Sequence, residues 1–506
     1  MENLTLILLL ILIFSLLFNY LSFSYKMTSF EIVNDMGIGI NFGNTFDCFV
    51  PYKNISSPED QVTLLGNSFP TKKMILNIKK SGFKTIRLPI TWLNFMDELG
   101  NINSEWISQI KEVVQWVINN NMYCIINVHH DGKSGNWLSK GLISKNKYDK
   151  LWTQIAKEFK DFNEYLIFES MNEVEFVTES GDYDYETLHI LTQSFIDIVR
   201  NSGGINSKRF LIISGANTEI YLSISEDFKL PSDPVNNYGV SIHYYYPYEY
   251  TKQHINENGR KDWGNELDFE DIMGNFYMLK KSFLDKNIPV IVDEVGVLTE
   301  DGKDTDTMKE YLYIVFSLVA GFDGMMCCLW DTSNKEFGDM NYYNRVTKKW
   351  YDEKIKKFLS KIAQGKYVSM WDFFINTNQI PLQAIDYDSE GNVVSYFLDD
   401  LTLSKLIFYV RYNGNYSESD IELSCDFKDG TSKKIEFNKK NGIKQYDGTT
   451  KYTVNVLIPN CTDYFNAIKL KDPGNIIFKN FTLEFYEEFD LFDMDSYKES
   501  VLKNIN

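Results

Sequence analysis

Short apolar runs alternate with amphipathic stretches through the first two thirds of the chain. Each run is bounded by polar residues and predicts a β-strand, and there are eight of them: 37–43, 84–90, 123–129, 166–171, 209–215, 238–245, 289–296 and 324–331. Between them apolar residues recur every three or four positions, as at Trp106, Ile110, Val113 and Val117, which is the period of a helix with one buried face. Eight such repeats favour a closed (β/α)8 TIM barrel over an open doubly wound sheet. No G-x-G-x-x-G follows the first run, which weakens the dinucleotide-binding alternative further.

The pattern changes near residue 365. From about Tyr367 onward the helical period fades, and short alternating runs separated by turn residues take its place. Such runs predict an antiparallel β-sandwich, smaller than the barrel. We therefore predict a barrel over residues 30–365, an all-β sandwich over 370–488 and a poorly ordered tail over 489–506. The sandwich resembles carbohydrate-binding modules in class only, and a module that merely packs on the barrel is equally consistent with its sequence.

The chain begins with an apolar segment. Leu4 to Phe18 is an almost unbroken apolar run, followed by the small residues Ser22 and Ser24. This run suits a signal peptide over residues 1–24 better than a membrane span, which needs about 20 residues. The segment carries Glu2 and no basic residue before the run, so an uncleaved membrane anchor is the alternative. The expected product is secreted, and four Asn-x-Ser/Thr sites would accept glycans in a eukaryotic secretory route: Asn54, Asn415, Asn460 and Asn480.

Composition narrows the classes of partner. The formal charge of −19 disfavours nucleic acids and anionic membrane surfaces. Aromatic residues make up 15% of the chain, which fits stacking on sugar rings, although compositional bias would also produce it. Six cysteines without C-x-x-C spacing disfavour a zinc module or a disulfide scaffold. Cys327 and Cys328 are expected to be packing residues, whereas Cys425 and Cys461 could pair. We expect no cofactor, no metal, no obligate protein partner and a monomeric chain.

Polar residues gather where the predicted strands end, which in barrels of this type is the edge that carries the active site. Three of the five histidines lie at such ends. Glu173 and Glu294 lie at the ends of the fourth and seventh runs, which are nearly opposite in a ring of eight strands. Paired carboxylates without a phosphate loop or metal spacing indicate glycoside hydrolysis. The alternatives are two solvated loop acids, or a zinc site at 129–131, where adjacent ligands would seldom reach one metal.

The strand ends resemble those of glycoside hydrolase family 5, the cellulase family A of endoglucanases. The resemblance covers about residues 32–362, and seven strand ends agree in residue type and order. It implies a retaining enzyme in which Glu173 is the general acid/base and Glu294 the nucleophile. It also implies a set of substrate-binding and supporting residues, namely Asn41, Arg87, His129, His130, Asn172, His243, Tyr245 and Trp330.

Three residues of this set have specific expected roles. By the resemblance, Asn172 bonds the 2-hydroxyl of the sugar, and Arg87 keeps the nucleophile ionised. Trp330 is the platform beneath the sugar next to the scissile bond. The physical chemistry agrees, because a nearby cation favours an ionised carboxylate, while the acid must be protonated near the working pH and needs burial or a nearby anion.

The histidines at the strand ends carry less specific expectations. His243 and Tyr245, spaced as H-x-Y, are implied to tune the acid and the nucleophile. His129 matches the histidine of the third strand in the family, and His130 is its neighbour. His129 and His243 would alternatively be core histidines whose hydrogen bonds are satisfied.

The substrate follows from the resemblance alone. The segments 41–44 and 129–131 resemble the broad-specificity endo-β-1,4-glucanase branch, which acts on cellulose, mixed-linkage glucan and xyloglucan. A β-mannanase of the same fold and a non-catalytic polysaccharide-binding barrel are the alternatives. Four aromatic residues are candidate sugar platforms that each have a core alternative, with Trp137 favoured because it lies in a polar loop; they are Trp92, Trp137, Trp263 and Tyr246.

Overall fold

The chain forms two compact units. The first comprises Met1–Met370 and Lys498–Asn506, and the second comprises Trp371–Tyr497. The computed structural model describes residues 27–50, 55–178, 180–299, 302–335 and 340–369, together with strands and a helix farther along the chain. The predicted leader over 1–24, three of the four predicted glycan sites and Cys461 lie outside the described residues.

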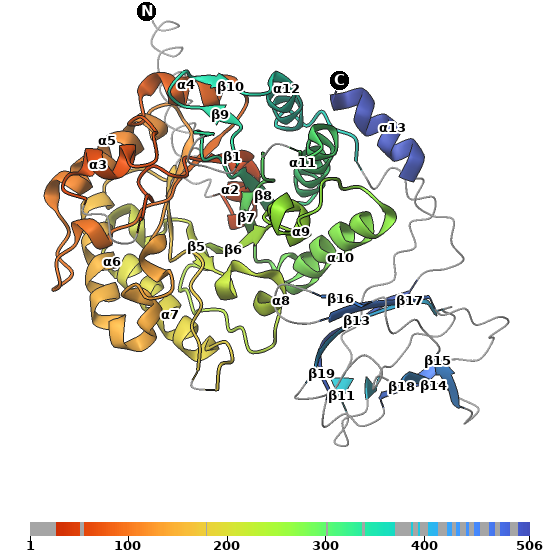
Figure 1. Ribbon diagram of the computed structural model, residues 1–506. Coiled ribbons are helices and arrows are strands. Elements are labelled where there is room, and N and C mark those ends of the chain that lie inside the picture. The colour runs from red at the N-terminus through yellow and green to blue at the C-terminus, as the bar shows by residue number, and fades with distance from the viewer. Residues whose placement is uncertain are drawn as a thin grey trace, which may run out of the picture. The chain divides into compact units, whose positions relative to one another are not determined.

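Eight parallel strands in sequence order close into a barrel in the first unit (Figure 1). The closure is the parallel pairing of the eighth strand with the first, in which Gly39 lies opposite Cys328. The strands are β1 Ile38–Asn41, β2 Thr85–Leu88, β3 Tyr123–Ile126, β4 Leu166–Glu169, β5 Leu211–Ser214, β6 Tyr238–Tyr244, β7 Val290–Val295 and β8 Met325–Leu329. The predicted barrel is confirmed. All eight strands end one to three residues before the predicted limit, so the polar residues that follow lie above the hydrogen-bonded ring.

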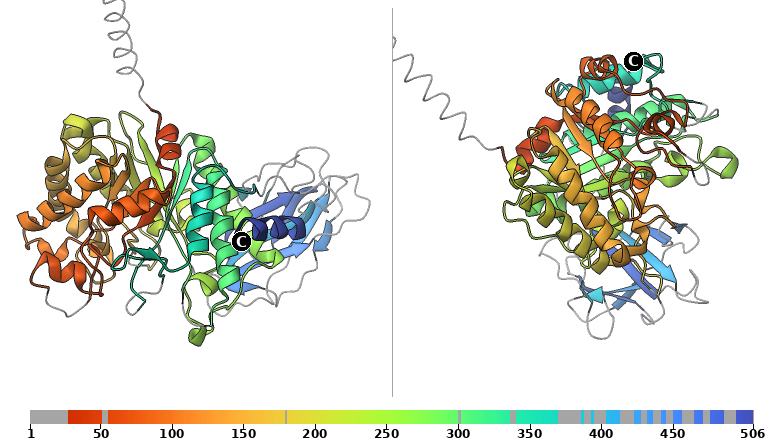
Figure 2. Two further views of the ribbon diagram at one scale, coloured as in Figure 1. Left: turned by 90° about the horizontal axis from the view of Figure 1, so that it is seen from above. Right: turned by 90° about the vertical axis from the view of Figure 1, so that its left-hand side faces the viewer.

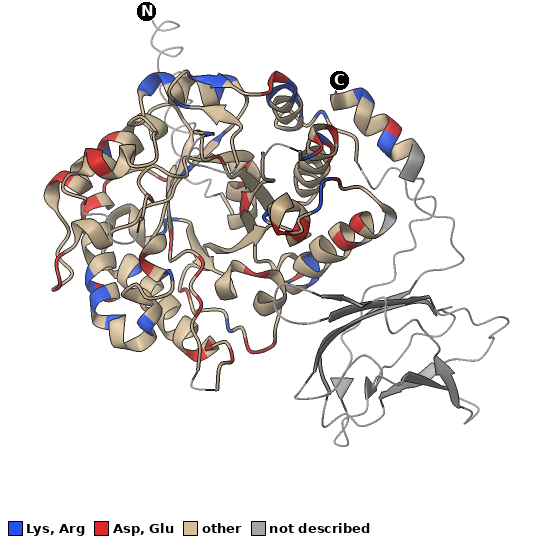
Figure 3. Cartoon of the chain, in the orientation of Figure 1, with Lys and Arg blue, Asp and Glu red and all other residues tan. Residues whose placement is uncertain are grey.

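Helices surround the strands (Figure 2). The long ones are α4 Lys72–Lys80, α5 Ser104–Ile118, α6 Lys145–Phe159, α7 Tyr185–Asn201, α10 Glu266–Ser282, α11 Thr305–Ala320 and α12 Glu353–Ile362. In α5 the predicted apolar face is buried, and the Asn103 side chain caps the first turn by accepting from two backbone N–H groups. Both signs of charge occur along these outer helices (Figure 3). Within the described residues, no helix has both the length and the apolar character needed to cross a membrane.

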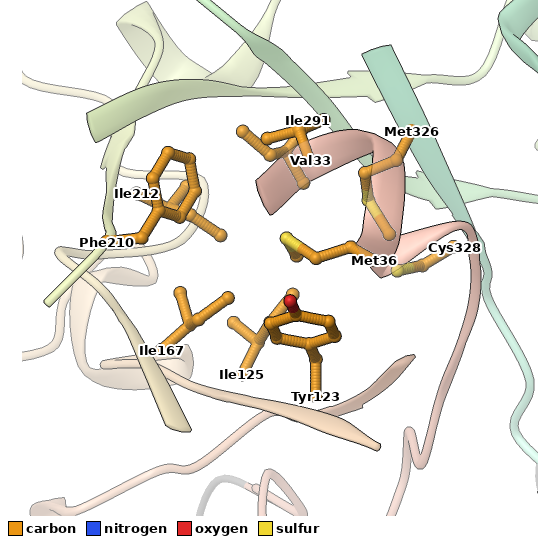
Figure 4. Close-up of a cluster of buried hydrophobic side chains, with 10 residues drawn as sticks. All are labelled: Val33, Met36, Tyr123, Ile125, Ile167, Phe210, Ile212, Ile291, Met326 and Cys328. Atoms are coloured by element: carbon orange, nitrogen blue, oxygen red, sulfur yellow. The ribbon is translucent and has the colours of Figure 1, made fainter. Parts of the chain in front are cut away.

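A short helix closes the end of the barrel where the strands begin. Helix α2, Ser29–Met36, places Val33 and Met36 against apolar side chains that point inward from several strands (Figure 4). These partners are Tyr123, Ile125, Ile167, Phe210, Ile212, Ile291, Met326 and Cys328. Burying each such aliphatic side chain contributes roughly 1.5–3 kcal/mol. Because this end is packed with side chains, the opposite end of the barrel carries the chemistry.

The second unit is all β, which confirms the predicted change of class. One antiparallel sheet has the order β11-β12-β18-β14-β15 and the other the order β16-β17-β13-β19. Their strands are β11 Asp386–Tyr387, β12 Val393–Val394, β13 Leu403–Tyr412, β14 Leu423–Phe427, β15 Ser432–Ile435, β16 Ile443–Lys444, β17 Thr450–Asn455, β18 Phe465–Leu470 and β19 Ile476–Phe485.

Residues 494–505 form a helix where a poorly ordered tail was expected over 489–506, and residues 489–493 and 506 lie outside the described residues. Helix α13, Met494–Ile505, buries Val501 and Ile505. The Lys361 ammonium donates to the carbonyl of Asn504, so the helix packs on the barrel unit. The missed signal was apolar residues spaced four apart, which form one face of a helix.

Candidate active site

The two predicted catalytic carboxylates come together above the barrel. Glu173 lies in the loop after β4, and Glu294 is the fifth residue of β7. Single ligand atoms of Glu173, Glu294 and His243 all lie within 4.8 Å of one another. Retaining glycosidases hold their carboxyl groups about 5–5.5 Å apart, whereas inverting enzymes need about 6.5–9.5 Å to admit a water molecule. Oxygen atoms this close agree with the shorter, retaining separation, and the stereochemical outcome itself stays a prediction.

Arg87 organises the buried floor of the site. Its Nη1 donates to Glu294 Oε1 over 2.8 Å and to Asn41 Oδ1 over 2.9 Å. Its Nη2 donates to Asn172 Oδ1 over 2.8 Å. Because the Asn172 oxygen accepts from Arg87, its amide N–H groups are left to donate toward a sugar hydroxyl. Glu169 accepts from Nε and Nη2 of Arg87, both over 2.7 Å, and the Arg87 side chain is fully buried.

Both carboxylate oxygens of Glu294 accept hydrogen bonds from buried groups. Besides the Arg87 guanidinium, the hydroxyl of Tyr245 donates to Glu294 Oε2 over 2.8 Å. The two carboxylate oxygens thus each accept one hydrogen bond, from Arg87 and from Tyr245. These two bonds fix the orientation of the carboxylate at the end of the barrel.

Glu173, the candidate acid/base residue, forms a close pair with His243. His243 Nδ1 is 2.7 Å from Glu173 Oε1. Burial raises the pKa of Glu173, but the Lys252 ammonium and the His243 hydrogen bond lower it below its ordinary value. The Glu173 side chain is 40% exposed, so water screens this shift. Burial lowers the pKa of His243, yet Glu294 and Glu173 raise it above the ordinary value.

Trp330, the predicted sugar platform, lies beside His129, and stacking of a sugar on it stays a prediction. The Trp330 ring lies almost parallel to the His129 ring, with 5.8 Å between centroids and 9° between planes. A Cβ atom on Gly43 would lie 2.9 Å from the Trp330 ring, so only glycine leaves room for the indole here. Burial and the neighbouring His130 lower the pKa of His129, and burial and Lys133 lower that of His130 to about 4. Both imidazoles are neutral near pH 7 and can exchange hydrogen bonds with hydroxyls.

Two of the four candidate platforms belong to the core instead. Trp92 is fully buried and donates from Nε1 to the carbonyl of Asn127. Trp263 is 4% exposed and packs edge-on against Tyr311. An indole has the same hydrophobicity in a core as in a cleft, so the sequence did not separate the two locations.

The other two candidates are partly exposed. Trp137 donates from Nε1 to Asp131 Oδ1 over 2.7 Å, and the Lys147 ammonium lies 5.2 Å from its ring centroid. Tyr246 donates to Glu219 Oε1 over 2.8 Å. Sugar stacking by Trp137 and Tyr246 stays a prediction.

Several residues of the site were not predicted as functional. They are Asn127, Glu169, Ser241, Lys252 and Asp293, of which all but Lys252 are buried in strands or at their ends. Glu169 and Asp293 carried a readable signal, because a carboxylate inside an apolar strand must be paired when it is buried.

Two groups of side chains have the composition of metal ligands. One is the candidate catalytic cluster of Glu173, His243 and Glu294, in which His243 is hydrogen-bonded to Glu173. The other is Asp47 with His129 and His130. The oxygens of Asp47 accept the backbone N–H groups of Asn44 and Thr45. We assign neither group as a metal site.

Comparison with known proteins shows to which family the chain belongs. Residues 47–336, more than half of the chain, match the cellulase family, glycosyl hydrolase family 5. The chain belongs to glycosyl hydrolase family 5. Among solved structures, a GH5-4 broad-specificity endoglucanase from an uncultured bovine rumen ciliate is 50% identical, with a TM-score of 0.65, and the match covers 67% of this chain and 99% of that one. A family 5 lichenase from Caldicellulosiruptor sp. F32 is 30% identical, with a TM-score of 0.62 over 67% of this chain and 96% of that one.

Curated relatives agree with the structural neighbours. Endoglucanase A of Clostridium longisporum is 31% identical over 350 residues, which is 65% of this chain and 65% of that protein. The match thus spans just under two thirds of the relative's length. Endoglucanase A of Paenibacillus barcinonensis is 30% identical over 63% of this chain and 90% of its own length.

Proposed function

We propose that this protein is an endo-acting β-1,4-glucanase that cleaves β-glucans with retention of configuration. The observation that carries the proposal is the close approach of Glu173, Glu294 and His243, with Arg87 and Tyr245 bonded to the nucleophile. The names of the relatives support the substrate class, since they include endoglucanases, a lichenase and a xyloglucan-specific endo-β-1,4-glucanase. All of the groups named here come from one chain, so the proposal needs no second subunit.

The first step forms a covalent glycosyl-enzyme. An ionised oxygen of Glu294 attacks the anomeric carbon, while protonated Glu173 delivers its proton to the leaving glycosidic oxygen. The C–O bond to the leaving sugar breaks as the new bond to Glu294 forms. A proton on His243 Nδ1, which lies 2.7 Å from Glu173, would reach the acid without crossing solvent. Asn172 binds the 2-hydroxyl, where hydrogen bonds strengthen toward the transition state.

The second step releases the sugar. Glu173, now ionised, removes a proton from a water molecule, which attacks the anomeric carbon and breaks its bond to Glu294. Two displacements at the same carbon restore the original configuration. Arg87 and Tyr245 stabilise the departing carboxylate through the hydrogen bonds that they make to its two oxygens.

A substrate panel tests the proposal. Purified protein should release reducing ends from carboxymethylcellulose, mixed-linkage β-glucan and xyloglucan, and little from mannan. Viscosity should fall before much reducing sugar appears, as expected for cleavage within chains. Activity on mannan alone would make the protein a β-mannanase, and binding without hydrolysis of any polymer would make it a non-catalytic polysaccharide-binding barrel.

We further propose that the protein is secreted as a glycoprotein. The support is the apolar run from Leu4 to Phe18, which is too short for a typical span, and the Asn-x-Ser/Thr sites. N-terminal sequencing of the mature protein should give a start near residue 25, and enzymatic removal of N-glycans should increase its gel mobility when the host is eukaryotic. A mature chain that still begins at Met1 and sediments with membranes would identify the segment as an anchor. Carbohydrate binding by the second unit stays a prediction.

A further inference from the structure

Strand β7 contains one residue more than its neighbours at the catalytic position. On the β6 side Ile242 lies opposite Val292 and His243 lies opposite Glu294, which leaves Asp293 without a partner. The pairing of β7 with β8 shifts at the same place. In a regular strand, consecutive side chains point to opposite faces, and a bulge of this kind changes that alternation. Asp293 and Glu294 consequently both point into the barrel, one below the other.

Asp293 lies beneath the acid/base pair and is fully buried. Ser241 Oγ lies 2.7 Å from Asp293 Oδ1 and 2.9 Å from Oδ2, and its hydroxyl donates to this carboxylate. The Oδ1 atom is also 3.4 Å from His243 Nε2. Within the described part of the chain, this buried nitrogen makes no hydrogen bond of good geometry to another group. His243 therefore has Asp293 at Nε2, and at Nδ1 it has Glu173 over 2.7 Å and Glu294 over 3.4 Å.

Two cationic side chains, Arg87 and His243, face Asp293 and balance its charge. The ionisable groups that face Asp293 come from four other strands and from β7 itself: Arg87 on β2, Glu169 on β4, His243 on β6, Cys328 on β8 and Glu294 on β7. Arg87 Nε donates to Glu169 over 2.7 Å and lies 3.5 Å from Asp293 Oδ2, so its best contacts are used by other carboxylates. Burial and the charge of Glu169 raise the pKa of Asp293 to about 7.

We propose that Asp293 is a positioning residue for acid/base catalysis, whose carboxylate keeps a proton on His243 within reach of Glu173. This inference rests on the proposed glycosidase function and adds a residue to it. Asp293 and His243 titrate as a pair, since charges this close do not ionise independently. The pair can therefore supply a proton to Glu173. The charged groups that face Glu173 are His243, His130 and Lys252.

The sign of the expected pH effect follows from the charges. In the pH profile of kcat/KM, the decrease at high pH (the alkaline limb) reports loss of the proton that His243 and Glu173 share. An anion below the imidazole raises the pKa for that loss, and Asp293→Asn removes the anion while keeping the shape and an oxygen that can accept from Ser241. The alkaline limb of the variant should therefore move to lower pH, by about 1–3 units.

Two substrates distinguish an effect of Asp293→Asn on proton transfer from a general disturbance of the fold. Cellotetraose needs protonation of its leaving oxygen, whereas 2,4-dinitrophenyl β-cellobioside has a leaving group that departs as an anion. Asp293→Asn should shift the alkaline limb for cellotetraose and leave the limb for the dinitrophenyl substrate where it is in the wild type. Equal losses on both substrates, with unshifted limbs, would show that Asp293 only supports the fold and would overturn the inference.

An NMR titration gives a readout that does not depend on turnover. The chain has only five histidines, and the His243→Gln variant identifies the imidazole signals of His243. In the wild type His243 should lose its proton above the ordinary histidine value of about 6.5, and in Asp293→Asn at a lower pH. A wild-type His243 that titrates below that value would overturn the inference even if the variant did not fold. Inactivity of the wild type on every β-glucan would overturn the proposed function instead, leaving the titration as the test of the pair.

Discussion

Replacing Glu294 with Gln is expected to lower kcat on β-glucan by roughly 10⁴- to 10⁶-fold, the range seen when a member of a catalytic unit is removed. The amide keeps the volume of the carboxylate but cannot form the covalent intermediate. Its NH2 group would also face Arg87 or Tyr245, which both donate to the carboxylate oxygens of the wild type. Little change in KM is expected, since the platform residues stay in place.

The measurement is initial-rate hydrolysis of carboxymethylcellulose and of cellotetraose. Glu175→Gln is the matched control, because Glu175 is an exposed carboxylate in the loop after β4 and should not affect the rate. In the wild type, a 2-deoxy-2-fluoro cellobioside with a dinitrophenyl leaving group should label the peptide that contains Glu294. Label on another carboxylate, or a Glu294→Gln variant within tenfold of the wild type, would contradict the assignment.

Replacing Glu173 with Ala is expected to lower kcat/KM on polysaccharide by about 10²- to 10⁴-fold, which is the usual contribution of general acid–base catalysis. The loss should be much smaller for 2,4-dinitrophenyl β-cellobioside, whose leaving group needs no proton. On that substrate the second step becomes limiting, because no base activates water. Added azide should speed turnover, since azide attacks the glycosyl-enzyme without needing a base.

The product of that reaction distinguishes the two glutamates. Azide rescue of Glu173→Ala should give the β-glycosyl azide, formed by attack on the intermediate at Glu294. An α-azide would mean that Glu173 is the nucleophile and that the roles are exchanged. Glu175→Ala is again the control and should show neither the loss nor the rescue.

Much of the site could be predicted from the sequence because the barrel repeats a simple pattern. Eight apolar runs separated by helical periods determine eight parallel strands, and the carboxyl ends of such strands meet at one edge. Any polar residue directly after a run is thereby placed at that edge. Glu173 follows the fourth run and Glu294 lies near the end of the seventh, so both are expected at that edge, and the structure brings them together with His243.

Other features of the site depend on contacts between side chains of different strands and helices, which the sequence does not show. Glu169 and Asp293 are carboxylates in apolar strands, and only the folded barrel shows that both reach toward Arg87. The extra residue of β7 has no signature in the strand's own sequence, because a bulge is defined by the register of the neighbouring strands. The buried positions of Trp92 and Trp263 likewise depend on neighbours distant in sequence.

The sequence by itself determined the barrel, the edge where the strands end and the candidate catalytic pair at that edge, since local periodicity and chain order suffice for these. Only the tertiary structure decided which charges neutralise one another, which indoles face the core, and that the last helix packs on the barrel unit. The physical reason is that periodicity specifies which face of an element is buried. It does not specify which side chain another element brings against that face.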